Sequence, residues 1–180
     1  MKVLKFGGTS VGSAERMKNL VPLINSAEPK IVVLSAMSGT TNSLVEIANA
    51  LYSKENDQAK KLINALEKKY EAVIKELFLS PHEKGSKGGF KKSQELIKNH
   101  FEFIRSFTLD LFTANEEKAI LAQGELLSTS LVHFYLHLVN SGFGGAEDFK
   151  NVRIHYHDLI LFRNVLPYVQ NKSCKCCVFV

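Results

Sequence analysis

The first residues that could do chemistry lie at the start of the chain, where the strand candidate Val3–Phe6 ends at the pair Gly7 and Gly8. Paired glycines between a strand and a helix let backbone N–H groups approach an oxyanion, and the helix N-terminus adds a partial positive charge. Lys5 would place an ammonium at the carboxyl end of the strand, where open α/β sheets bind ligands. This pattern predicts a phosphate cradle.

Thr9 and Ser10 would add hydroxyl donors to this first loop. The loop is not a Walker A motif, because Ser13 stands where the lysine belongs after Gly7 and Gly12, and no G-x-G-x-x-G dinucleotide fingerprint is present. Taken without further information, a glycine pair after a strand is more often a plain turn. Both interpretations stay open at this point.

A second polar loop, residues 35–42, follows the apolar strand candidate Ile31–Leu34. Its sequence Ser-Ala-Met-Ser-Gly-Thr-Thr-Asn gathers four hydroxyls, an amide and a glycine. In a parallel sheet this loop would lie beside the first one and could bind a carboxylate or a phosphate. The alternative is a loop whose hydroxyls cap the next helix.

The third segment, residues 123–128 (Gln-Gly-Glu-Leu-Leu-Ser), lies inside the helix expected over 115–138. A glycine within a helix costs about 1 kcal/mol relative to alanine, so Gly124 indicates close approach by another group. Glu125 is flanked by apolar residues and is expected to be partly buried, which calls for a cationic partner such as a substrate ammonium or Lys5. The alternative is a solvated glutamate.

Residue types that ligate metals do not form a site. His133 and His137 lie one helical turn apart without a third ligand nearby, which favours two histidines on a helix face. Cys174, Cys176 and Cys177 are too close together in sequence to close a tetrahedral zinc site or to spread a disulfide framework through the chain. We therefore expect no metal ligands.

The loops require a framework of strands and helices. Two strands that are each followed by a loop and a helix predict an α/β fold with a parallel sheet, and the continuously apolar Ile31–Leu34 is typical of a strand covered on both faces. The first helix is expected to begin at the N-cap Ser13. Amphipathic patterns predict further helices over 58–79 and through 96–111, separated by a loop at 80–89, as a helical insertion at about 55–115.

Composition excludes several classes of protein. The chain has 180 residues, of which 45% are hydrophobic and 23% are charged, with a net charge of +5. Disorder is excluded by the apolar content, and a membrane span by the absence of about 20 uninterrupted apolar residues. There is no secretory signal and no basic cluster interleaved with aromatics, so we expect a cytoplasmic protein with no membrane or nucleic-acid partner.

Together the three segments resemble the aspartokinase family. The resemblance rests on Val3–Val11, Val33–Asn42 and Gln123–Ser128, and it covers about residues 1–140. It implies the three-layer α/β/α amino-acid-kinase fold, present in part. It also implies transfer of the γ-phosphoryl of MgATP to the β-carboxylate of L-aspartate, a step toward lysine (through diaminopimelate), threonine and methionine.

The resemblance also implies roles for individual residues. Lys5 would be the catalytic residue that contacts the transferred phosphoryl, and Glu125 would pair with the α-ammonium of aspartate. The implied phosphate-binding residues are Gly7, Gly8, Thr9 and Ser10. The implied aspartate-binding residues, besides Glu125, are Ser35 and Thr41.

The part of the family that would complete the site cannot be matched in the sequence. Residues 1–140 are expected to be the N-terminal part of the kinase domain, and 141–180 a divergent tail that a change of reading frame could explain. The family's Gly-Ser-Asp segment and its ACT modules are not found, so we expect the chain alone to be inactive, whereas full-length members are expected to be homo-oligomers. Alternatives are a kinase of glutamate, acetylglutamate or carbamate, or a non-catalytic remnant that binds a nucleotide or another anion.

Overall fold

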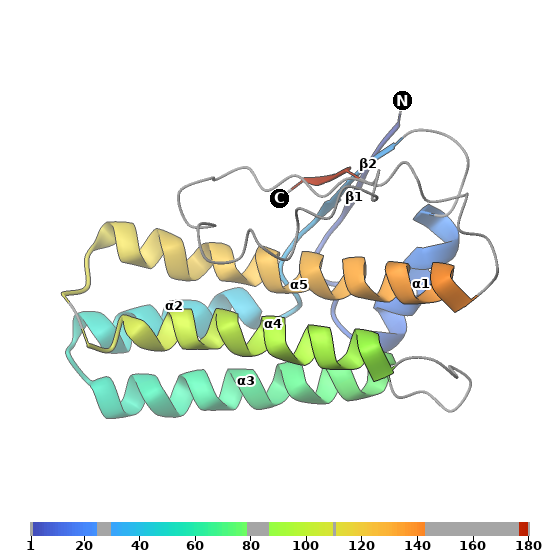
Figure 1. The fold of residues 1–180 in the computed structure, drawn as a ribbon. Coiled ribbons are helices and arrows are strands. Elements are labelled where there is room, and N and C mark those ends of the chain that lie inside the picture. Colours follow the sequence, from blue (N-terminus) through green and yellow to red (C-terminus); the bar gives the residue numbers. More distant parts are fainter. Residues whose placement is uncertain (1, 25–29, 79–86, 110, 143–176, 180) are drawn as a thin grey trace.

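A small parallel sheet lies on one side of a set of helices in the computed structural model, which describes residues 2–24, 30–78, 87–109, 111–142 and 177–179 (Figure 1). The sheet has the order β1 (Lys2–Phe6), β2 (Lys30–Leu34), β3 (Cys177–Phe179), and all its strands are parallel. Phe6 is paired with Leu34 and Val33 with Phe179. The carboxyl ends of β1 and β2 therefore end level with each other.

The helices are long and pack mainly on one another. Helices α2, α3, α4 and α5 contact in a cycle, each next to the following one and α5 next to α2, and α1 lies beside α3 and α5 (Figure 1). Their bounds are Ala14–Ile24 for α1, Thr40–Tyr52 for α2, Asn56–Phe78 for α3, Lys87–Ser106 for α4 and Ala114–Gly142 for α5. The expected α/β fold with a helical insertion is confirmed in the described residues.

Large aromatic side chains fill the space between these helices. Tyr70 of α3 packs edge-to-face on Phe101 of α4, with ring centroids 5.9 Å apart, and Phe78 packs similarly on Tyr135 of α5 at 6.2 Å. Arg105 of α4 also hydrogen-bonds Asn64 and Glu67 on α3. The apolar stripes of the insertion are therefore core, as their spacing indicated.

The sheet differs from the sequence expectation in two respects. Val32 and Leu34 are buried, whereas Ile31 and Val33 on the other face of β2 stay partly exposed to solvent. The strand is thus covered on one face in this part of the chain. A third strand also forms at 177–179, where the sequence pattern had suggested no element.

Two helix ends also differ. Helix α4 ends at Ser106 and not near Leu111, because the Thr108 hydroxyl and amide both donate to the Arg105 carbonyl and close the last turn. Leu111 is 81% exposed. At the other end α4 begins at Lys87, so 87–89 are helical, whereas the rest of the loop expected at 80–89 lies outside the described residues, as does the tail at 143–176.

Candidate functional site

The first loop leads from the end of β1 into α1. Ser13 is the N-cap expected from the sequence, because its Oγ accepts a hydrogen bond from the Arg16 amide at 3.3 Å. Within the loop the Ser10 amide donates to the Gly7 carbonyl at 2.8 Å, and the Gly12 amide donates to the Thr9 carbonyl at 3.3 Å. Consecutive turns therefore carry the chain from the strand to the helix.

Two backbone amides of this loop remain available. In the described part of the chain, the N–H groups of Gly8 and Thr9 have no acceptor. Gly7 is exposed, and a Cβ added there would meet nothing within 4 Å. Free amides beside open space are what a phosphate cradle requires.

The second loop packs directly on the first. The Ser35 amide donates to the Phe6 carbonyl at 3.0 Å, which continues the strand pairing by one residue. A Cβ at Gly8 would lie only 2.7 Å from the Ala36 carbonyl oxygen, so only glycine lets the two loops approach so closely. The expectation that the two loops lie side by side is confirmed.

The second loop ends earlier than its sequence suggested. Gly39, with φ of 79°, ends it in the left-handed region, and Thr40 already belongs to α2. No side chain caps this helix, and within the described residues the amides of Thr41 and Asn42 have no acceptor. The first turn of α2 thus presents free N–H groups and the exposed Thr41 side chain beside the first loop.

Helix α5 packs on the second loop through the third motif. A Cβ at Gly124 would lie 2.8 Å from the Ala36 Cβ, which confirms the close approach expected of this helical glycine. The Ser128 Oγ donates to the Ser35 carbonyl at 2.7 Å. Gln123 turns away from the loops and accepts, through Oε1, a hydrogen bond from Nδ1 of the buried His100 at 2.6 Å.

Glu125 keeps a carboxylate at this junction. It is half-buried, and in the described part of the chain it forms no ion pair. Burial raises the pKa of Tyr70 above its usual value, and the negative charge of Glu125 raises it further. The hydrogen bond with Thr40 acts in the opposite direction and lowers this pKa. Tyr70 bonds the Thr40 hydroxyl at 3.0 Å, and a Cβ at Gly124 would lie 3.5 Å from the Thr40 side chain, so Glu125 lies near the start of α2.

Lys5 is not brought to Glu125. The residues on either side of Lys5 in β1 face the helices, Phe6 packing on the core, so the alternation of the strand places Lys5 on the opposite face, where it is exposed. Of the two cationic partners considered for Glu125, the described structure therefore does not supply Lys5. A cation from a ligand remains the partner that the geometry leaves open.

Three other side chains reach these loops without any signal in the sequence that singles them out. Ser38 Oγ donates to the Gly8 carbonyl at 2.9 Å, Lys69 Nζ of α3 donates to the Ser38 carbonyl at 2.8 Å, and Arg16 Nη1 donates to the Thr9 carbonyl at 2.6 Å. Lys69 and Arg16 lie on the polar faces of amphipathic helices, where a charged residue is the ordinary expectation.

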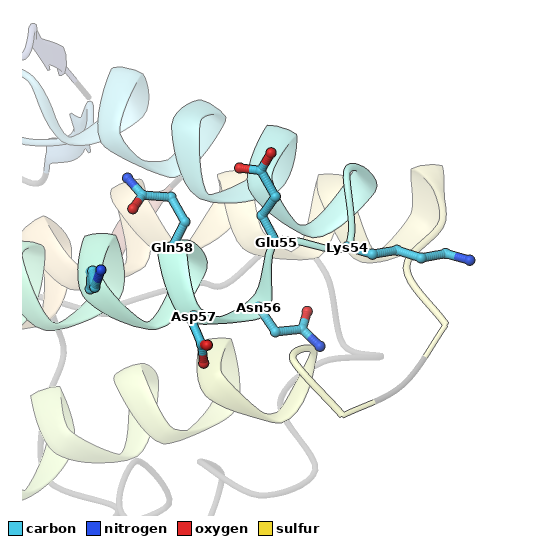
Figure 2. Close-up of a pocket in the computed structure, with 6 residues that line it drawn as sticks. Lys54, Glu55, Asn56, Asp57 and Gln58 are labelled. Carbon is cyan, nitrogen blue, oxygen red and sulfur yellow. The ribbon is translucent and has the colours of Figure 1, made fainter.

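A shallow hollow of about 460 Å³ lies at the turn between α2 and α3, far along the bundle from the loops (Figures 1 and 2). Its labelled side chains, from Lys54 to Gln58, point in different directions and do not converge on a common point (Figure 2). None of the motif residues lines it. We therefore place the candidate site at the two loops and the third motif on α5, and not at this hollow.

Two features are absent from the described residues. They contain no group of three or more His, Cys, Asp or Glu side chains that could hold a metal ion. Nor do they contain a helix of the length and apolarity needed to cross a membrane.

Comparison with known proteins finds matches to amino acid kinases. The sequence model of the amino acid kinase family matches residues 1–172, beyond the boundary expected near residue 140. The aspartokinase of Chlamydia trachomatis is 32% identical over 136 residues, which cover 74% of this chain and 27% of that protein. The chain thus spans about a quarter of the length of this relative, and the origin of its tail stays a prediction.

Solved structures of E. coli aspartokinase III share the fold. The complex with lysine and aspartate (T-state) matches with a TM-score of 0.60 and 25% identity, over 78% of this chain and 29% of that one. The complex with aspartate and ADP (R-state) matches with a TM-score of 0.63 and 20% identity, over 99% of this chain and 40% of that one.

Proposed function

The chain belongs to the amino acid kinase family, and from that premise we propose that it supplies the phosphate and aspartate loops of an aspartate kinase. In the reaction a β-carboxylate oxygen of L-aspartate forms a bond to the γ-phosphorus of MgATP, the bond to the β–γ bridging oxygen breaks, and ADP leaves. The observation that supports the proposal is the packing of all three motif segments around Ser35 and Ala36: Gly8 and Gly124 approach Ala36, and Ser128 bonds the Ser35 carbonyl.

The phosphate groups of MgATP would lie on the first loop. Gly7 leaves room for them, the free amides of Gly8 and Thr9 would donate to phosphate oxygens, and Ser10 would add a hydroxyl. Lys5 would bring its ammonium to the transferred phosphoryl from the open face of β1. Mg²⁺ arrives in this scheme with the nucleotide, as part of the substrate.

Aspartate would lie between the second loop and α5. Ser35 and Thr41 would hold it, with Thr41 acting at a helix N-terminus whose amides favour a carboxylate. Glu125 would pair with the α-ammonium, which would supply the cation that a half-buried carboxylate requires. An acceptor whose amine is acylated would lack this charge, and this difference would favour a free amino acid over acetylglutamate.

Calorimetric titration of the 180-residue chain with MgADP and with L-aspartate tests the proposal. We expect both to bind and Glu125→Gln to weaken aspartate alone. Lys5→Met should weaken binding of MgATP, whose γ-phosphoryl it would contact, more than binding of MgADP. Glu46→Gln, on the exposed side of α2, is the matched control for Glu125. Preference for L-glutamate or acetylglutamate would favour another amino-acid kinase, and loss of both ligands in one variant would contradict the separate roles.

Phosphoryl transfer is a second test. The chain with MgATP, L-aspartate and hydroxylamine would form aspartyl hydroxamate if it made the acyl phosphate. We expect none from the chain alone, because transfer depends on positioned electrostatic donors worth about 10²–10³ each, and residues beyond the three motifs would have to provide the rest. Hydroxamate at a rate above a Lys5→Met control would contradict this expectation.

A further inference from the structure

The Ser38 hydroxyl joins the two loops of the site. Its Oγ donates to the Gly8 carbonyl at 2.9 Å, a contact between residues 30 positions apart. Gly12 makes room for it, since a Cβ there would lie 2.9 Å from the same Oγ. The exposed hydroxyl therefore packs against the first loop although it belongs to the second.

This contact fixes the direction of one amide. In a trans peptide the C=O and N–H groups point in opposite directions, and the described chain contains no cis peptide. The hydroxyl that holds the Gly8 carbonyl therefore turns the Thr9 N–H of the same peptide away from Ser38. Since this N–H has no acceptor among the described residues, it is held as a free donor.

The next peptide of the loop is held as well, but its amide is already used. Arg16 Nη1 donates to the Thr9 carbonyl at 2.6 Å, and the Ser10 N–H of that peptide donates to the Gly7 carbonyl. Of the two peptides whose carbonyls are held by side chains, only the one between Gly8 and Thr9 leaves its N–H for a ligand.

Lys69 holds Ser38 from the helical insertion. Its Nζ donates to the Ser38 carbonyl at 2.8 Å and lies 3.4 Å from where a Cβ on Gly39 would be. Lys69 therefore fixes the peptide between Ser38 and Gly39, at the point where the loop turns into α2. Through this one side chain α3 supports the loop that carries the hydroxyl.

We propose that Lys69 and Ser38 form a clamp that positions the Thr9 amide for a phosphate oxygen of the bound nucleotide. Both are positioning residues, because they act on backbone groups of the loops and not on the substrate. The inference rests on the proposed function for its ligand, but the clamp itself can be tested without one.

The test compares Ser38→Ala and Lys69→Met with two matched controls in the full chain. Ser43→Ala removes a hydroxyl that donates to the Gly39 carbonyl within α2, and Lys68→Met removes the exposed neighbour of Lys69. Ser38→Thr keeps the hydroxyl and should restore its contact. Amide hydrogen exchange over residues 7–12 without ligand, calorimetric titration with MgADP and the melting temperature are measured for each variant.

We expect Ser38→Ala and Lys69→Met to speed exchange over residues 7–12 and to raise the Kd for MgADP about two- to tenfold, the worth of one ordinary hydrogen bond. Ser38→Thr should return both values toward wild type, and the two controls should change neither. If Ser38→Ala melts at a much lower temperature, the exposed Lys69→Met carries the test.

The outcomes separate the clamp from the proposed function. Unchanged exchange in both Ser38→Ala and Lys69→Met, or faster exchange with an unchanged Kd, would overturn the clamp as a positioning device. The wild-type chain could fail to bind MgADP while Ser38→Ala and Lys69→Met still exchange faster than wild type over residues 7–12. That result would support the clamp and contradict the proposed function.

Discussion

Replacing Gly124 by alanine should destabilise the chain, although alanine is the better helix former. The gain in helix propensity is about 1 kcal/mol. Against it, the new Cβ would lie 2.8 Å from the Ala36 Cβ, where carbon atoms prefer about 3.5–4.0 Å, and overpacking of this kind costs about 1–3 kcal/mol. We expect a net loss of up to about 2 kcal/mol in the free energy of unfolding, measured by urea denaturation followed by circular dichroism.

The sign should reverse when Ala36 is first replaced by glycine. The clash then disappears, and the remaining neighbours of the new Cβ, at 3.4 Å on Leu44 and 3.5 Å on Thr40, are side-chain carbons near ordinary contact. On the Ala36→Gly background, Gly124→Ala should stabilise the chain by about 1 kcal/mol. Equal effects on the two backgrounds would refute the close packing of α5 on the second loop.

Three further substitutions test individual contacts within the fold. Ser128→Ala leaves the Ser35 carbonyl without its donor and should lower the free energy of unfolding by about 1–2 kcal/mol; no change would show that water replaces the bond. Thr113→Ala removes the side chain that accepts from the Asn115 amide at the start of α5 and should cost about 1 kcal/mol by the same assay, against an exposed control such as Thr41→Ala, which should be neutral. Burial lowers the pKa of His100 below 6.5, and the hydrogen bond to Gln123 opposes this shift only in part. The unfolded chain therefore binds the proton more tightly than the folded chain. Wild type should lose stability as the pH falls below about 6.5. His100→Gln should flatten this loss between pH 7 and pH 5, and parallel pH profiles would contradict the buried neutral imidazole.

The sequence pattern predicted those parts of the site that depend only on residues near one another along the chain. The apolar runs that became β1 and β2, the Ser13 cap and the close approach at Gly124 all follow from residue type and spacing. Turn and helix signals are local, so a single sequence carries them. The first two loops were also expected to lie side by side, because parallel strands place their loops at one edge of the sheet.

The contacts between segments could not be predicted from spacing. The bond from Ser38 to Gly8 depends on β1 and β2 ending level, and the bond from Lys69 depends on how α3 packs against α2. The possible pairing of Lys5 with Glu125 was not found, because the alternation of β1 turns Lys5 to the face away from the helices. Helix α4 ends at Ser106 and not near Leu111 as predicted, because the hydroxyls of Ser106 and Thr108 bond the carbonyls of its last turn.

The central claim is that the two loops and the third motif on α5 form one site for a nucleotide and an amino acid. The most direct test follows the backbone amide resonances of the chain by NMR during titration with MgADP and then with L-aspartate. The account predicts that MgADP shifts the amides of residues 7–10 and that aspartate shifts those of Ser35, Thr41 and Glu125. Amide shifts confined to the hollow at 54–61, or no shifts at the two loops and the third motif, would contradict the central claim.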